Sequence, residues 1–203
     1  MTILTIPNLI TLTRIILTPL YLYFILVPRY GYKLASLIIF SIAIFTDLID
    51  GYYARKYGKT SRTGNFLDPL ADKILIISAY ISFTFVNDLI PIWMVLVIFI
   101  RDLVVTGLRI AFERKGLSMT TRKTAKYKTA IQGFNIFFIL IYLVIIEHFN
   151  IGFLNKLVNF IEEYKLVYDI TLVATIITVY TGIDYILVNR KILKESGAHS
   201  ETS

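Results

Sequence analysis

Six long apolar segments separated by polar stretches dominate the sequence. Each has about 20 residues, the length that a helix needs to cross the hydrocarbon core of a bilayer. They cover approximately residues 7–27, 34–54, 69–87, 90–112, 130–148 and 167–189. Residues 150–165 instead alternate Leu, Val, Phe and Ile with Asn, Lys and Glu, which is typical of an amphipathic helix at the membrane interface. The pattern predicts an all-α integral membrane protein, a single domain over residues 1–203 with a frayed tail at 194–203.

The composition supports a membrane protein and excludes two other classes. Hydrophobic residues make up 56% of the 203 residues, the mean hydropathy is +0.69, and only 17% of residues are charged. Soluble domains carry about 25% charged residues, and disordered chains are far less apolar than this one. The chain has no cysteine, which excludes disulfides, thiolate metal sites and cysteine nucleophiles.

The basic residues predict the orientation of the chain in the membrane. Fourteen of the 21 Lys and Arg residues fall in the loop 55–63, the stretch 109–128 and the C-terminal tail, whereas four fall in the connections on the other side. Basic residues concentrate in cytoplasmic loops. We therefore expect a multi-pass protein of the plasma membrane with both termini, and the active site described below, on the cytoplasmic side.

Four aspartates stand at the ends of apolar segments, where charge is costly and usually functional. Asp47 and Asp50 are three residues apart near the end of the second segment, and Asp68 and Asp72 are four apart around the start of the third. On a helix each spacing places both carboxylates on one face, and consecutive antiparallel helices bring the two faces together. Clustered carboxylates repel one another unless cations lie between them, and all-oxygen ligands suit Mg²⁺ or Mn²⁺. Such ions typically act on phosphate substrates.

Three other interpretations compete with a metal-dependent enzyme. The acids would form ion pairs with Arg55, Lys73 and Arg101 in a packed bundle, or line a small cation transporter or channel, or belong to a purely structural membrane protein. Transport requires no basic residue one turn from the acids. Gly51 and Ala54, two small residues on the face of Asp47, let a flat group approach the helix. These features favour the enzyme.

The residues from Asp47 to Asp72 form the pattern Asp-x2-Asp-Gly-x2-Ala-Arg-x8-Gly-x3-Asp-x3-Asp. This pattern resembles the signature of the CDP-alcohol phosphotransferase family. The resemblance implies a six-helix membrane fold, commonly dimeric, with a dinuclear metal site that faces the cytoplasm.

The resemblance also implies a role for each matching residue. Asp47, Asp50 and Asp68 are expected to bind two metal ions, and Asp72 to bind the second ion and to act as the catalytic base. The expected contacts to CDP-diacylglycerol lie in this motif and near the N-terminus: Thr11, Arg14, Asp50, Gly51, Ala54, Arg55 and Ser61.

Basic residues elsewhere bear on the acceptor alcohol. Arg101 and Arg109 are eight residues apart, a little over two helical turns, so they face one direction. Lys126 and Lys128 come just before the fifth segment. Together the four predict a pocket for a phosphate dianion, which a neutral alcohol such as choline would not need. The simpler alternative, orientation and binding of anionic lipid heads, explains Arg101 poorly because this residue lies well inside an apolar segment.

Three stretches narrow the resemblance to the bacterial phosphatidylglycerophosphate synthase branch of the family: 6–14, 46–73, and 101–109 with 126–129. Asp102 and Ala125 depart from that branch, where Glu and Gly are expected. The resemblance implies transfer of a phosphatidyl group from CDP-diacylglycerol to sn-glycerol 3-phosphate, with release of CMP. It also implies a homodimer. No nucleic-acid partner is expected. The second most favoured acceptor is inositol phosphate. Transfer to serine and the formation of cardiolipin are less favoured.

Overall fold

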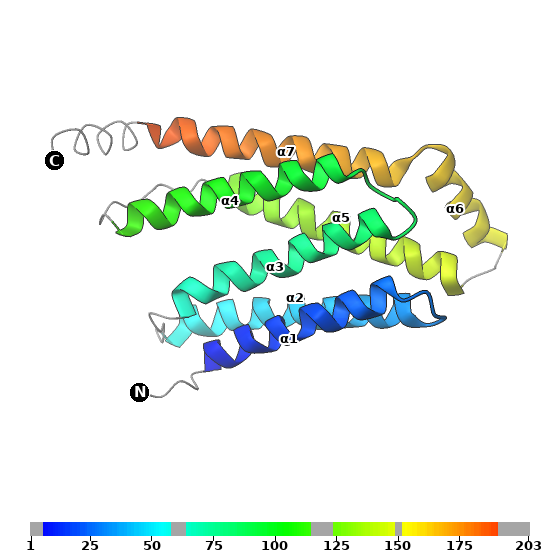
Figure 1. Ribbon diagram of the computed structural model, residues 1–203, viewed down its shortest axis with the longest axis horizontal. Coiled ribbons are helices and arrows are strands. Elements are labelled where there is room, and N and C mark those ends of the chain that lie inside the picture. Colours follow the sequence, from blue (N-terminus) through cyan, green and yellow to red (C-terminus); the bar gives the residue numbers. More distant parts are fainter. Residues whose placement is uncertain (1–5, 58–63, 115–123, 149–151, 191–203) are drawn as a thin grey trace. The chain divides into compact units, whose positions relative to one another are not determined.

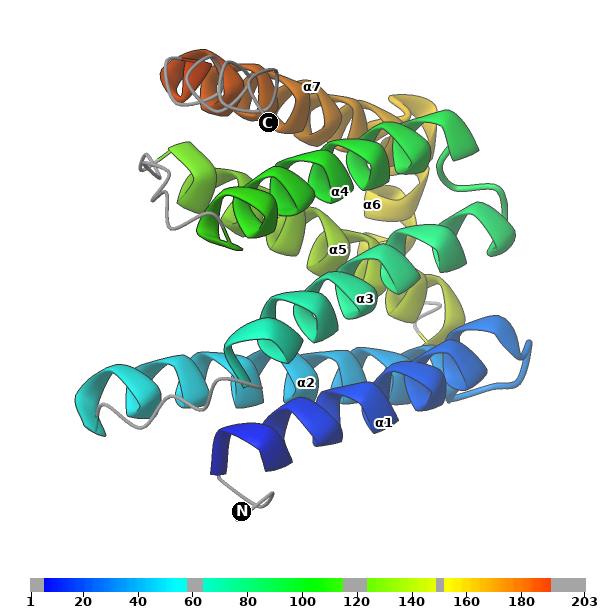
Figure 2. The ribbon, with the colours of Figure 1, turned by 60° about the vertical axis from the view of Figure 1, so that its left-hand side comes forward.

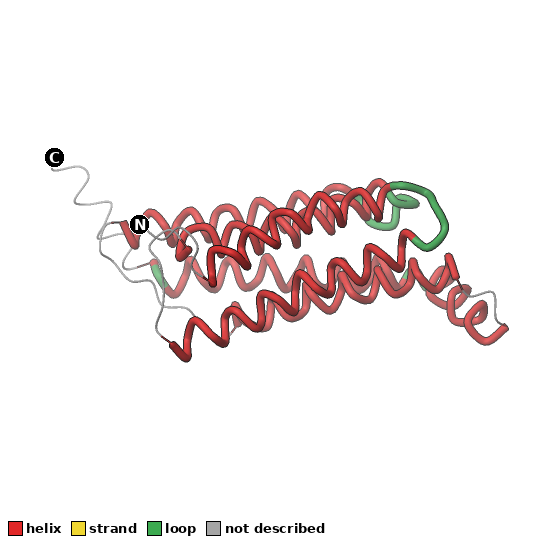
Figure 3. Tube along the Cα trace, turned by 90° about the horizontal axis from the view of Figure 1, so that it is seen from below, coloured by secondary structure: helices red, strands yellow, loops and turns green. Residues whose placement is uncertain are grey.

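A computed structural model describes residues 6–57, 64–114, 124–148 and 152–190 of the chain. Side chains are described for residues 13–46, 73–112, 127–148 and 152–190. The described residues form seven helices joined by short loops, with no strand among them (Figures 1 and 3). The helices are α1 (Ile6–Leu26), α2 (Tyr32–Tyr57), α3 (Gly64–Phe85), α4 (Ile92–Arg114), α5 (Thr124–His148), α6 (Gly152–Glu163) and α7 (Leu166–Val188).

The all-helical prediction is confirmed, and each of the six apolar segments lies on one long helix. Two stretches among the described residues are long and apolar enough to cross a membrane, namely Tyr127–His148 and Leu166–Val188. Three more helices contain shorter apolar stretches, and α4 has charged residues within its length. Six membrane spans therefore stay a prediction.

The amphipathic segment predicted at 150–165 contains the short helix α6. Phe153, Leu157 and Phe160 are exposed at helical spacing, whereas Ile161 is buried. The Tyr142 hydroxyl of α5 donates a hydrogen bond of 3.0 Å to the Glu162 carboxylate, which fastens α6 to the preceding helix. An exposed apolar stripe beside long apolar helices fits a membrane interface, and this location also stays a prediction.

The chain divides into two compact units, and the first contains α1, α2, α3, the second half of α5 and α6 (Met1–Ile90 with Ile136–Val167). Within it, α1 lies beside both α2 and α3 (Figures 1 and 2). The fully buried ring of Phe40 on α2 packs against Tyr21 at 5.6 Å and against Phe137 at 5.4 Å between centroids. The hydroxyls of Tyr21 and Ser82, 3.0 Å apart, hydrogen-bond α1 to α3.

The second unit contains α4, the first half of α5 and α7 (Pro91–Asn135 with Tyr168–Ser203). Buried threonines spaced four, three and three residues apart give α7 a buried polar face: Thr171, Thr175, Thr178 and Thr181. Three of these hydroxyls also bond the carbonyl three or four residues earlier, a common arrangement for threonine in a helix.

The aromatic core of the first unit can be tested with two phenylalanines of the same helix. We expect Phe40→Ala to lower the free energy of unfolding by about 3–5 kcal/mol, because it removes a buried ring and leaves a cavity. Phe45 is 61% exposed, so Phe45→Ala is the matched control and has a much smaller effect. Denaturation in detergent micelles measures both; equal losses would contradict this packing.

Candidate active site

The four predicted metal ligands lie on two consecutive helices of the first unit. Asp47 and Asp50 belong to the second half of α2, and Asp68 and Asp72 to the first three turns of α3. The backbone is helical at all four positions, as their spacing requires. Their side chains lie outside the described set, so the convergence of the two pairs stays a prediction. Among the side chains that are described, no three His, Cys, Asp or Glu residues are grouped closely enough to hold a metal ion.

Most of the predicted CDP contacts lie in the same part of the chain. Gly51, Ala54 and Arg55 follow Asp50 on α2, and Thr11 lies on α1, all with helical backbone and undescribed side chains. Ser61 falls between the described ranges. The side chain of Arg14, on α1, is described and is buried, with 3% exposure. A charge at such a position is usually functional or paired.

In the second unit the structure brings together two of the four residues predicted to bind the acceptor. The Asp102 carboxylate on α4 accepts hydrogen bonds from the Lys128 ammonium on α5, at 2.5 Å to Oδ1 and 2.6 Å to Oδ2. The same Oδ1 accepts a hydrogen bond of 3.0 Å from the Arg101 guanidinium. Asp102 and Lys128 are buried, so one carboxylate joins two cations in an apolar interior.

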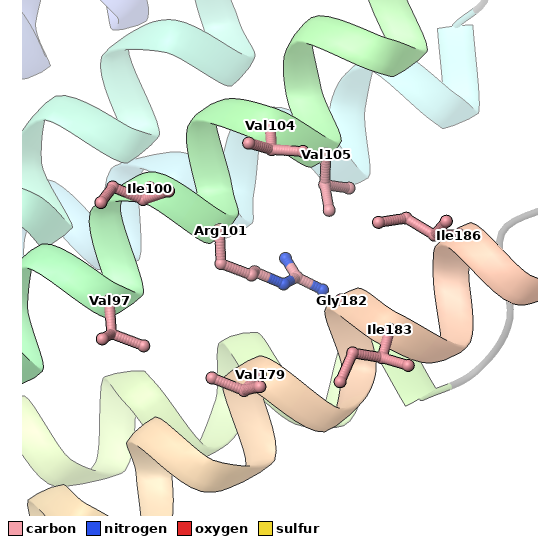
Figure 4. A pocket seen from close by; sticks show the side chains of 9 residues that line it. All are labelled: Val97, Ile100, Arg101, Val104, Val105, Val179, Gly182, Ile183 and Ile186. Atoms are coloured by element: carbon pink, nitrogen blue, oxygen red, sulfur yellow. The ribbon is translucent and has the colours of Figure 1, made fainter.

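The guanidinium of Arg101 extends from α4 towards α7 (Figure 4). Its Nη2 donates a hydrogen bond of 3.0 Å to the Thr181 hydroxyl. Arg101 is the one charged side chain in a groove of about 300 Å³ lined by described residues of α4 and α7. The groove is lined by Val97, Ile100, Arg101, Val104, Val105, Val179, Gly182, Ile183 and Ile186. Its other lining residues are apolar, and a polar contact in apolar surroundings is stronger than in water.

The other two predicted acceptor contacts are less defined. Arg109 lies two turns further along α4 and is half-buried, without a hydrogen bond or ion pair to any described residue. Lys126 lies in the first turn of α5, and its side chain is outside the described set. The sequence alone does not single out Thr181 and Gly182, because the last apolar segment has the length and composition of a membrane span. The threonines at helical spacing in that segment were the available signal for a polar face.

Comparison with known proteins identifies the family. The sequence profile named CDP-alcohol phosphatidyltransferase matches residues 4–182, which is most of the chain. The chain belongs to this family. The match extends to Gly182 on α7, so it includes α5, α6 and most of α7, where the sequence resemblance is limited to hydrophobic spans.

Two bacterial relatives that match nearly the whole chain have the same enzyme name. The CDP-diacylglycerol–glycerol-3-phosphate 3-phosphatidyltransferase of Bacillus subtilis is 37% identical, covering 94% of this chain and 97% of the relative. The Aquifex aeolicus protein of the same name is 30% identical, covering 93% and 97%. The CMP-forming cardiolipin synthase of Rattus norvegicus is 41% identical, but over only 61% of this chain and 39% of the relative.

The buried carboxylate leads to a direct test. We expect Asp102→Asn to lower the free energy of unfolding by about 3 kcal/mol or more, because it leaves Arg101 and Lys128 without their shared counter-charge. Asp102→Glu keeps the charge and should lose less. Asp169, exposed on α7, provides the control Asp169→Asn, which should have little effect. Thermal unfolding of the purified variants measures all three, and a fully stable Asp102→Asn protein would contradict the arrangement.

Proposed function

We propose that this protein transfers the phosphatidyl group of CDP-diacylglycerol to the 1-hydroxyl of sn-glycerol 3-phosphate, giving phosphatidylglycerophosphate and CMP. The observation that carries the proposal is the 37% identity to the Bacillus subtilis enzyme of that name over nearly the whole of both chains. The unbroken family signature from Asp47 to Asp72 supports the same donor. The enzyme would thus act in phospholipid biosynthesis.

The four aspartates are proposed to hold two divalent cations, Mg²⁺ or Mn²⁺. The four residues fit such ions, because carboxylate oxygens are the ligands that hard divalent cations prefer. Each pair of aspartates also lies on a single helix. Asp47, Asp50, Asp68 and Asp72 would be the ligands of these ions. When bound, such ions polarise a pyrophosphate and stabilise the charge of a leaving phosphate.

The remaining steps fall to side chains of the protein. The acceptor hydroxyl oxygen would attack the phosphorus of the phosphatidyl group. The bond from this phosphorus to the CMP oxygen breaks, and CMP leaves with the bonding electrons. Asp72 would take the proton from the hydroxyl as general base.

The other proposed roles concern binding. Residues near the donor would hold the cytidine diphosphate, namely Thr11, Arg14, Asp50, Gly51, Ala54, Arg55 and Ser61. The acceptor phosphate would be held by Arg101, Arg109, Lys126 and Lys128. Binding at two anchored phosphates orients the hydroxyl towards the phosphorus, and this orientation is a major source of rate.

We also propose a membrane arrangement that suits both substrates. Six helices would span the plasma membrane, with both termini and the aspartates on the cytoplasmic side, where the excess of Lys and Arg places them. The acyl chains of the donor would then stay in the bilayer while its headgroup reaches the aspartates. Two copies of the chain would form a homodimer, as the family resemblance implies.

One second candidate has an observation in its favour. The rat relative is named a CMP-forming cardiolipin synthase, and such an activity would use the same donor with a lipid acceptor. It matches this chain over a smaller share than the two bacterial relatives do. Glycerol 3-phosphate therefore remains the favoured acceptor.

An acceptor panel tests the proposed reaction. We expect purified protein with CDP-diacylglycerol and Mg²⁺ to release CMP with glycerol 3-phosphate, because the cationic side chains predicted for the acceptor suit a phosphate monoester. Phosphatidylglycerol, serine and free inositol lack a phosphate monoester and should give little. Inositol phosphate should give less than glycerol 3-phosphate, the acceptor in the name of the Bacillus subtilis relative. Removal of the metal with a chelator should stop release, and added Mg²⁺ or Mn²⁺ should restore it. Preferred use of another acceptor would replace the proposed substrate.

The proposed base leads to a separate test. We expect Asp72→Asn to abolish CMP release, because the amide can neither accept the proton nor replace a charged metal ligand. Binding of CDP-diacylglycerol should largely persist, since three aspartates and the CDP contacts remain. Asp88 lies exposed after α3, and Asp88→Asn should turn over like the wild type. Full turnover of Asp72→Asn would remove this residue from the mechanism.

A further inference from the structure

Hydrogen bonds link α4, α5 and α7 into a closed triangle inside the second unit. Each pair of helices is joined by a hydrogen bond between buried or half-buried side chains: Asp102–Lys128, Gln132–Thr178 and Thr181–Arg101. Asn135 and Thr171 form a second link between α5 and α7. On each helix, the residues that make the two links of the triangle are neighbours or lie one turn apart. A closed triangle of this kind restrains how each helix slides or rotates against the other two.

Thr181 offers its hydroxyl to Arg101 as an acceptor. The hydroxyl hydrogen points along α7 to the Thr178 carbonyl, at 3.0 Å. A hydroxyl has one hydrogen and two lone pairs, so the lone pairs of Thr181 remain for the Arg101 Nη2. The Asp102 carboxylate holds Nη1 from the other side. The guanidinium plane is therefore fixed between α4 and α7.

Gly182 leaves the space through which the Arg101 side chain passes. A Cβ atom at this position would lie 2.9 Å from Arg101 Cγ and 3.1 Å from Nε. Cγ is near the base of the side chain, so Arg101 would have to change its path from α4. Figure 4 shows the guanidinium directed at Gly182. Gly107 and Gly133 have open space at the same point, so the close approach is specific to Gly182 among these helical glycines.

We infer that Thr181 and Gly182 are positioning residues, which hold Arg101 in the orientation that receives the phosphate of the acceptor. Each terminal nitrogen of a guanidinium carries two N–H groups, and the described contacts use one of each. One N–H on each terminal nitrogen therefore remains to donate to a phosphate oxygen. The inference rests on the proposed function, because it assigns Arg101 to the acceptor.

The first experiment compares Gly182→Ala with Gly107→Ala, an exposed position on α4. We expect Gly182→Ala to raise the KM for glycerol 3-phosphate about tenfold or more, as the loss of a hydrogen bond to a charged group does. The KM for CDP-diacylglycerol should stay within about twofold in the same variant, since Thr181 and Gly182 serve the acceptor alone. Gly107→Ala should leave both constants unchanged. Both variants exchange helical Gly for Ala, so a general effect on the helix would appear in both.

The second experiment remains informative if Gly182→Ala fails to fold. Thr181→Val removes the acceptor oxygen with little change of shape, and it should raise the same KM. Thr181→Ser keeps the hydroxyl and should restore the wild-type value. If Thr181 and Gly182 had a merely structural role, Thr181→Val and Gly182→Ala would lower stability or kcat. They would not raise the KM for glycerol 3-phosphate more than the KM for CDP-diacylglycerol.

The outcomes separate the two proposals. If the wild type releases CMP with glycerol 3-phosphate while Gly182→Ala and Thr181→Val keep its KM, the positioning role is wrong and the proposed function stands. If the two substrates show the same rise in KM, the positioning role is likewise overturned. If the wild type releases no CMP with glycerol 3-phosphate, the proposed function fails and the inference that rests on it fails too.

Discussion

The second unit depends on one buried carboxylate. Asp102 lies in an apolar interior, where an isolated charge would be prohibitively unfavourable. It is stable there because Lys128 and Arg101 both donate hydrogen bonds to it, at 2.5 to 3.0 Å. The dependence is mutual, since Lys128 is also buried and would lack its counter-charge without Asp102. A buried ion pair of this kind adds little net stability, but the loss of one partner is costly because the other charge is left buried and unpaired.

The geometry of Arg101 follows from this constraint. Neighbouring residues on a helix point in different directions, so a short side chain at position 101 could not meet Asp102. Arginine is long enough for Nη1 to return to its own helix while Nη2 reaches Thr181. Lysine has a single terminal nitrogen and no plane, so it would not span both acceptors in one fixed orientation. The two contacts restrain the otherwise flexible guanidinium, so it has little freedom left to lose in the proposed binding of a phosphate.

The sequence predicts most of the helices and the motif, but not the contacts between helices. The apolar segments are long enough to identify each helix, and the spacing of the aspartates follows from the helical repeat alone. Arg101 was noticeable as a charge within an apolar segment. Thr181 and Gly182 were not, because their role depends on which face of α7 meets α4. A helical repeat indicates that the threonines share a face, whereas the partner of that face is a property of the packed structure.

Charge in this hydrophobic chain is therefore handled in two distinct ways. On α2 and α3, exogenous divalent ions are the proposed counter-charge of the four carboxylates. In the second unit the counter-charge is internal, since Asp102 accepts from both Lys128 and Arg101. The contrast matches the needs of the two substrates. A pyrophosphate donor repels carboxylates unless metal ions lie between them, whereas the proposed acceptor phosphate would bind directly to cations that the protein itself holds in place.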